Sequence, residues 1–180
     1  RKRTGTITNR IIKGKKSFEI ITRGLEVLCN MEHRGARGAD NVSGDGAGIL
    51  MQLPHSFYKK IGIKLPLAGR YGTGLIFLPK DETEEKFCLE VLIQILEEEG
   101  LEFLQLRDVP TDTNAIGEIA RQSEPVIKQI FVGGNYEQDE LERRLYLARK
   151  QAESYIRATK MKEKEMFYIP SLSSKVLVYK

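Results

Sequence analysis

The chain has 180 residues, of which 41% are hydrophobic and 30% are charged. This composition suits one globular domain with a core of its own. The 29 basic and 25 acidic residues leave a net charge of only +4, dispersed along the chain, so we expect no nucleic-acid partner. No apolar run approaches the roughly 20 residues that span a bilayer, so we expect no membrane partner.

The two cysteines form no spaced pair, which argues against a disulfide framework or a zinc site and favours a reducing cytoplasm. Cys29 lies beside the apolar stripe of one predicted helix, and Cys88 lies in a second. No basic neighbour is placed to lower the pKa of either thiol. We expect both to be small core residues rather than nucleophiles.

In the first third of the chain, an Ile- and Thr-rich stretch predicts a strand over residues 6–12. Ser17 is a candidate N-cap for a helix that runs to about residue 31. The helical spacing is carried by Phe18, Ile21, Leu25 and Leu28. A strand over 49–53 and one or two helical turns over 55–61 follow.

The rest of the chain alternates strands and helices. The predicted strands are 72–78, 101–109 and 126–132, and the predicted helices are 81–99, 116–122 and 137–158. The last helix is the clearest, because an apolar stripe recurs through Leu141, Leu145, Ala148, Ala152 and Tyr155. Residues 166–172 and 175–179 are predicted to form a hairpin with its turn near Ser173 and Ser174. This mixture of elements predicts α+β layers.

A glycine-rich segment is the first place to look for chemistry. Five glycines lie between Gly35 and Gly48, interspersed with Arg34, Arg37, Asp40 and Asp45. Such a loop could hold an anion, but the spacing matches neither known phosphate-loop pattern, and composition alone favours a tight connection between a helix and a strand.

The two histidines give little support for a reactive site. His33 follows the first predicted helix. It could be a general base, but a histidine at this position more often caps the helix C-terminus. His55 is assigned no role, and no carboxylate stands at metal-ligand spacing from either residue.

Four segments, read together, resemble the amidotransferase domain of the glutamate synthases. They are MEHRGARGAD (31–40) with SGDGAGIL (43–50), LRDVPTDTNAIGEIARQSEPVIKQIFV (106–132), LERRLYLARK (141–150) and FYIPSLSSKVLVYK (167–180). They occur in the family's order and span most of the chain. The resemblance therefore identifies residues 1–180 as one class II glutamine amidotransferase domain.

The resemblance implies a fold and an activity. The fold is the four-layer α/β/β/α sandwich of the N-terminal-nucleophile hydrolases, which we expect to be incomplete here. The activity is hydrolysis of glutamine to glutamate and ammonia, the ammonia then serving to aminate 2-oxoglutarate in other domains or subunits. FMN and an iron–sulfur cluster are implied for the full enzyme, and no cofactor is expected in this chain.

The resemblance also points to site residues, with a departure. In the family, a cysteine at the mature N-terminus attacks the glutamine amide, and its own α-amine is the general base. Counting back from Lys13 and Gly14 places Thr4 at the position of that cysteine. Arg34 and Gly35 match the residues that hold the nucleophile, whereas Asp45 is expected only to shape its loop.

Three hypotheses remain open. The first is the glutaminase domain, inactive as this chain because the threonine amine is blocked by Arg3 and because the family's Asn-Gly motif is not among these residues. The second is a nucleophile-free relative that serves as a scaffold in a larger complex. The third is an anion-binding module built on the glycine-rich loop around Arg34.

Overall fold

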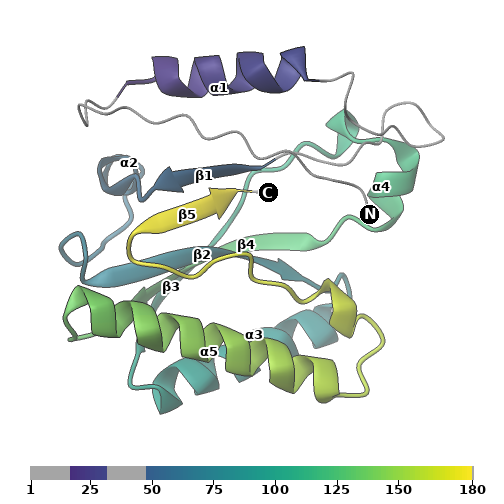
Figure 1. Cartoon of the computed structure of the whole chain (residues 1–180). Helices are drawn as coiled ribbons and strands as arrows, with labels where there is room; N and C mark the ends of the chain where they lie inside the picture. The colour runs from purple at the N-terminus through teal and green to yellow at the C-terminus, as the bar shows by residue number, and fades with distance from the viewer. Residues whose placement is uncertain (1–16, 32–47, 180) are drawn as a thin grey trace.

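The computed structural model describes residues 17–31 and 48–179. In Figure 1, helices α3 (Glu82–Glu98) and α5 (Gln138–Ala158) lie beneath a three-stranded sheet. A two-stranded sheet lies above it, and helix α1 (Glu19–Asn30) lies on top. This order confirms the α+β class and the sequence of layers that the family resemblance implied. The strand predicted over residues 6–12 lies outside the described residues.

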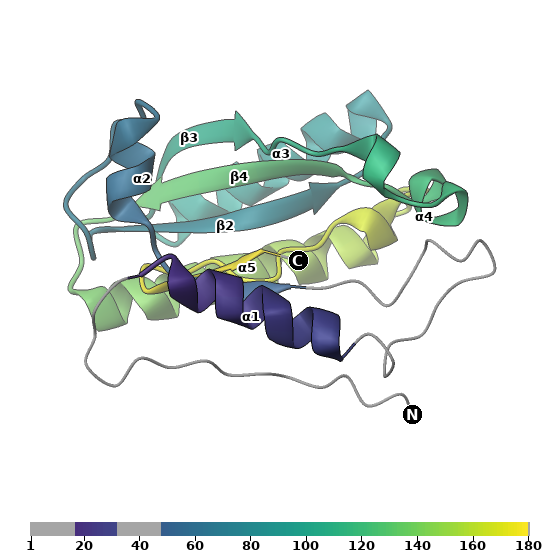
Figure 2. The same ribbon diagram turned by 90° about the horizontal axis from the view of Figure 1, so that it is seen from above.

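The central sheet is antiparallel, with strand order β2-β4-β3. Its strands are β2 (Tyr71–Leu78), β4 (Val126–Gly133) and β3 (Glu102–Asp108). The pairing of β3 with β4 shifts register between Phe103 and Gln105, which marks a β-bulge on the outer strand. Seen from above, β3 lies on the side of the sheet away from α1 (Figure 2).

The second sheet joins parts of the chain that are far apart in sequence. Strand β1 (Ile49–Gln52) pairs antiparallel with β5 (Val176–Tyr179), and Ile49 lies opposite Tyr179. The predicted hairpin between residues 166–172 and 175–179 is therefore wrong.

The segment before β5 instead runs along the edge of β2, where Phe77 bridges Tyr168 and Thr73 bridges Ser173. The chain changes sheets at Ser173 and Ser174. Two apolar runs separated by a short polar pair can belong to one sheet or to two, and local sequence does not distinguish these arrangements.

Short helical turns complete the fold. They are α2 (His55–Lys60), α4 (Glu118–Gln122) and two 3₁₀ turns at Thr113–Ala115 and Lys164–Met166. Helix α2 covers one end of the upper face of the central sheet (Figure 2). There the Tyr58 ring meets Phe131 of β4 edge-on, with 5.0 Å between ring centroids.

Helix α3 begins where the sequence predicts, because the Asp81 carboxylate accepts hydrogen bonds from the backbone N–H groups of Thr83 and Glu84. It ends before Gly100, whose φ of 72° suits glycine. Its buried face comprises Cys88, Val91, Leu92, Ile95 and Leu96. Phe87, one turn before Val91 on the same helix, is 36% exposed.

Helix α5 buries the predicted stripe over most of its length. Leu141, Leu145, Ala148 and Ala152 are fully buried against α3 and the lower face of the sheet. At the last step Ile156 is buried, whereas Tyr155 is 55% exposed. The 3.6-residue helical period allows either Tyr155 or Ile156 to end the buried stripe, and in the structure it is Ile156 that packs in the core.

Helix α1 forms as predicted, but its N-cap is Phe18 and not the predicted Ser17, whose hydroxyl accepts a hydrogen bond from the Glu19 N–H. Its apolar side chains are not buried by the described residues: Phe18 is 78% exposed and Leu25 54% exposed. Cys29 on this helix is also exposed, so its prediction as a core residue is wrong. Periodicity identifies an apolar face but not what covers it.

Gly74 provides a test of how the chain before β5 packs on β2. A Cβ added there would overlap the Ser171 carbonyl oxygen, which the backbone can relieve only by shifting. We expect Gly74→Ala to lower the free energy of unfolding by about 1–3 kcal/mol, measured by urea denaturation. Gly24→Ala in α1 is the matched control, since its Cβ meets nothing within 4 Å. That control should stabilise slightly or change nothing, and equal effects of the two substitutions would contradict the packing described.

Candidate functional site

The residues predicted to form the reactive site lie outside the described part of the chain. These are Thr4, Arg34 and Gly35, together with the loop residue Asp45. The structure does describe the elements that flank the glycine-rich segment in sequence. Helix α1 ends at Asn30 before it, and β1 begins at Ile49 after it.

Three of the segments that carry the family resemblance meet in the described framework. The 106–132 segment supplies β4, and the 141–150 segment forms part of α5 beneath it. The 167–180 segment runs along β2 and then pairs with β1 through β5. The upper face of β2 and β4 therefore faces the β1–β5 pair, and Tyr58, Tyr71, Phe131 and Leu177 are fully buried between them.

A buried amide lies within this space. Gln129 is fully buried on β4, and its Nε2 donates to the Tyr58 hydroxyl at 2.9 Å and to Thr73 Oγ1 at 3.0 Å. The Thr73 hydroxyl in turn donates to the Ile130 carbonyl at 2.6 Å. Burial raises the pKa of the Tyr58 hydroxyl above its usual value, so this group stays neutral. The network ties α2 to two strands through uncharged hydrogen bonds.

Two buried polar atoms beside this network have no partner among the described residues: Oε1 of Gln129 and Nε of Arg107. Arg107 on β3 lies opposite Gln129 on β4 in the strand register. One atom is an acceptor and the other is a donor, so a single water molecule could satisfy both.

The crossing between the sheets is held by a carboxylate from α5. Glu142 accepts hydrogen bonds from the Ser173 hydroxyl, at 2.9 Å to Oε2, and from the Ser174 backbone N–H. The Ser173 oxygen also accepts from the backbone N–H of Lys175 at 3.0 Å. Charge-assisted bonds of this kind are among the stronger ones in proteins. They fix the point where the chain leaves β2 and enters β5.

His55, which sequence reasoning left without a role, has a defined partner. Its Nδ1 lies 3.0 Å from the hydroxyl of Tyr71, which is fully buried. Burial raises the pKa of the Tyr71 hydroxyl to about 12. His33, the other histidine, lies outside the described residues.

The described cysteines differ in accessibility. Cys88 is fully buried, as predicted, and burial together with the nearby carboxylates of Glu84 and Glu85 raises the pKa of its thiol to about 12. Cys29 is exposed. Over residues 17–31 and 48–179, no group of three or more His, Cys, Asp and Glu side chains is arranged to hold a metal ion. Within the same ranges, no helix is both long and apolar enough to cross a membrane.

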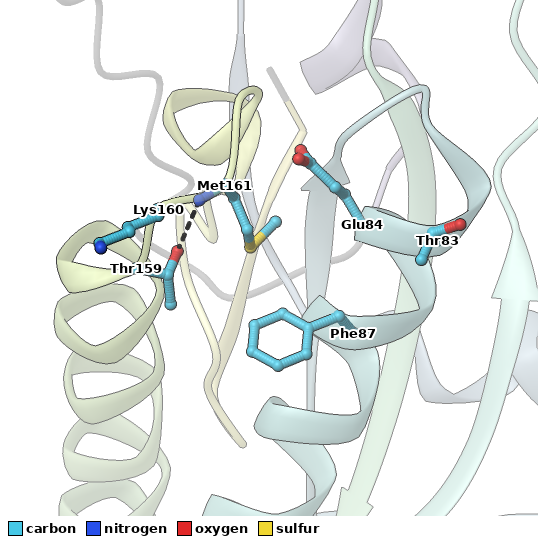
Figure 3. A pocket seen from close by; sticks show the side chains of 6 residues that line it. All are labelled: Thr83, Glu84, Phe87, Thr159, Lys160 and Met161. Carbon is cyan, nitrogen blue, oxygen red and sulfur yellow. Dashed lines mark hydrogen bonds between the residues drawn. The ribbon is translucent and has the colours of Figure 1, made fainter.

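A hollow between the helices of the lower layer is not a reactive site. It has a volume of about 310 Å³ and is lined by Thr83, Glu84, Phe87, Thr159, Lys160 and Met161 (Figure 3). Its walls are mainly apolar, since Phe87 and Met161 face it from opposite sides. The Glu84 carboxylate is occupied, accepting from the backbone N–H groups of Lys162 and Glu163. The walls are thus mainly apolar, and the one carboxylate that lines the hollow is already engaged.

Comparison with known proteins decides the family. The model of the family "Glutamine amidotransferases class-II" matches residues 4–180. The chain belongs to the class II glutamine amidotransferases. The N-terminal-nucleophile hydrolase fold predicted from the sequence is thereby confirmed, in agreement with the layers in Figure 1.

The similar proteins are glutamate synthases. The chain is 40% identical over 174 residues to the glutamate synthase [NADPH] large chain of Bacillus subtilis and 39% identical over 176 residues to the chloroplastic ferredoxin-dependent glutamate synthase of Oryza sativa subsp. japonica. It is 38% identical over 181 residues to the glutamate synthase [NADH] of Schizosaccharomyces pombe. Each match covers 94% of this chain but only 11%, 11% and 8% of the respective relative. The chain therefore spans about a tenth of the length of these relatives.

Sequence reasoning missed the Gln129 network and the anchor at Glu142. The signal for the first was a polar pair, Lys128 and Gln129, inside an otherwise apolar run over residues 126–132, because one member of such a pair faces the core and needs partners there. No comparable signal marked Glu142, because a glutamate on the polar side of an amphipathic helix is ordinary.

The network can be tested with Tyr58→Phe, which leaves one Nε2 hydrogen of Gln129 without its acceptor. We expect the free energy of unfolding to fall by about 1–2 kcal/mol in a denaturant titration. Tyr155→Phe removes the same hydroxyl from an exposed site and should stay within about 0.5 kcal/mol of the parent. A Tyr58→Phe protein as stable as the parent would contradict the role of this hydroxyl.

The cysteines can be distinguished by alkylation. At pH 8, iodoacetamide should modify the exposed Cys29 in the folded protein and leave Cys88 unmodified, because a thiol with a pKa of about 12 carries almost no thiolate at that pH. Peptide mass spectrometry gives the result. Modification of both thiols at similar rates without denaturant would refute the buried placement of Cys88.

Proposed function

We propose that this chain is the glutaminase domain of a glutamate synthase, in which glutamine is hydrolysed to glutamate and ammonia, and the ammonia aminates 2-oxoglutarate. The observation that carries the proposal is the class II family match over residues 4–180, together with 38–40% identity to three glutamate synthases. Because the chain spans about a tenth of each relative, the amination belongs to domains or subunits beyond it. FMN and an iron–sulfur cluster belong there as well, and no step is assigned to them here.

Within the proposed site, Arg34 and Gly35 support the nucleophile, and Thr4 occupies the nucleophile's position. The chemistry needs a nucleophilic side chain and a free α-amine on the same residue. The amine of Thr4 is part of the peptide bond to Arg3. We therefore propose that the protein, with residues 1–3 in place, does not hydrolyse glutamine.

A scaffold role is the alternative, and the same threonine favours it. A nucleophile-free domain could retain the fold and its contacts with partner domains while contributing no chemistry. The two unpaired cysteines fit a reducing compartment under either proposal.

The nucleophile can be tested by restoring it in the protein that contains this chain. Thr4→Cys in a protein that begins at residue 4 exposes a thiol and an α-amine on one residue, and we expect this variant to release ammonia from glutamine in a coupled assay. Thr4→Cys with residues 1–3 retained has the thiol but a blocked amine, and should remain inactive. The parent should also be inactive.

Two results would count against the proposal. Robust glutamine hydrolysis by the parent that is lost in Thr4→Ala would mean that the threonine is processed and reactive. No activity in the cysteine variant with a free amine, despite unchanged folding, would favour the scaffold.

A further inference from the structure

A cavity of about 380 Å³ lies where four elements meet, on the left of Figure 1. Strand β1 ends there, and β2, β5 and α5 begin there. It is lined by Gln52, Leu53, His55, Ala68, Gly69, Tyr71, Gln138, Ser174 and Lys175. It lies at the end of the β1–β5 pair opposite to Ile49 and Tyr179. Its volume falls within the range of small-molecule sites.

A buried hydroxyl in the wall of this cavity lacks a partner. Ser174 is only 4% exposed, and its Oγ has no hydrogen-bond partner among the described residues. Its backbone N–H is already engaged by Glu142. A buried hydroxyl without a partner is costly and is normally satisfied by water or a ligand.

The histidine in the wall has a tautomer that can donate into the cavity. The Tyr71 hydroxyl, protonated because burial raises its pKa to about 12, lies 3.0 Å from Nδ1 of His55. The tautomer of His55 that accepts at Nδ1 carries its proton on Nε2. In that tautomer the second nitrogen is an N–H donor. The amides of Gln52 and Gln138 at the rim add further donors.

The charges around the cavity favour the binding of one small anion. Lys175 lines it, and Gln138 is the first residue of α5, whose N-terminus carries a partial positive charge and whose N-cap makes no side-chain bond to it. Of the nearby carboxylates, that of Asp139 binds Lys175 at 2.7 Å, but its side chain is 93% exposed and can be displaced.

The two other nearby carboxylates have partners. Glu142 is held by Ser173 and Ser174, and Glu137 pairs with Arg70 at 3.0 Å. The hydrogen bond to Asp139 and the nearby charges of Asp139 and Glu142 raise the pKa of Lys175, but the hydrogen bond of this lysine is to Asp139, which is therefore the carboxylate that a small anion would replace.

We propose that this cavity binds a small carboxylate-bearing molecule, whose carboxylate replaces Asp139 at Lys175 and accepts hydrogen bonds from Ser174 and His55. The residues that would bind the carboxylate are all among those that the structure describes.

Hydrogen–deuterium exchange of the protein that contains this chain tests the site, with acetate as the probe and acetamide as its uncharged counterpart. Acetate should slow exchange in peptides covering 50–55, 67–72, 136–141 and 172–177, whereas acetamide and sodium chloride of equal ionic strength should not. Ser174→Ala and Lys175→Met should each raise the acetate concentration needed for half-maximal protection by about tenfold. Unchanged exchange in β4 and α3 verifies that the variants fold.

Matched controls lie away from the cavity. Ser154→Ala removes an exposed hydroxyl from α5, and Lys86→Met removes a lysine that is paired with Glu90 at 3.8 Å. Both should respond to acetate like the parent. The proposal is overturned if acetate gives no protection in these peptides, if acetamide protects equally, or if protection is unchanged in both Ser174→Ala and Lys175→Met.

Discussion

The anchoring of the crossing segment by Glu142 holds the two sheets of this domain in one arrangement. At Ser173 and Ser174 the chain leaves the edge of β2 and enters β5, and a carboxylate from α5 holds both serines. Helix α5 is itself fixed to the underside of the sheet by its buried stripe. One side chain thus connects the lower helical layer to the segment that enters the upper strand pair. The buried tyrosines and Gln129 lie in the space between the two sheets.

How far the sequence predicts this fold depends on the range of the interaction. Helix α3 was predicted over residues 81–99, close to its observed bounds, because helix start signals and periodicity are local properties. Strands β2 and β4 were predicted because both are apolar runs bounded by turn residues. The prediction of a hairpin between residues 166–172 and 175–179 was wrong because strand pairing depends on long-range contacts. Ser173 and Ser174 alone do not indicate which strands pair. The prediction that Cys29 is a core residue was wrong for a related reason, because an apolar stripe on α1 does not indicate which other part of the protein covers it.

The chemistry was predicted from motif resemblance and not from geometry. The motif resemblance predicts that Thr4, Arg34 and Gly35 belong to the site, and these residues fall outside the described part of the chain. The framework that the structure describes belongs to the class II amidotransferases. In the mechanism that we propose, the nucleophile and the base are one residue, so a peptide bond to the amine of that residue would silence the domain.

The bulge on β3 has a consequence for how this domain behaves at high concentration. Of the two outer strands of the central sheet, β2 is bordered by the segment leading to β5, whereas no described strand pairs with the outer edge of β3. A regular strand with an unpaired edge can form backbone hydrogen bonds with a strand of another molecule. The extra residue between Phe103 and Gln105 breaks the even spacing of N–H and C=O groups along that edge. The bulge in β3 therefore disfavours edge-to-edge strand pairing between molecules.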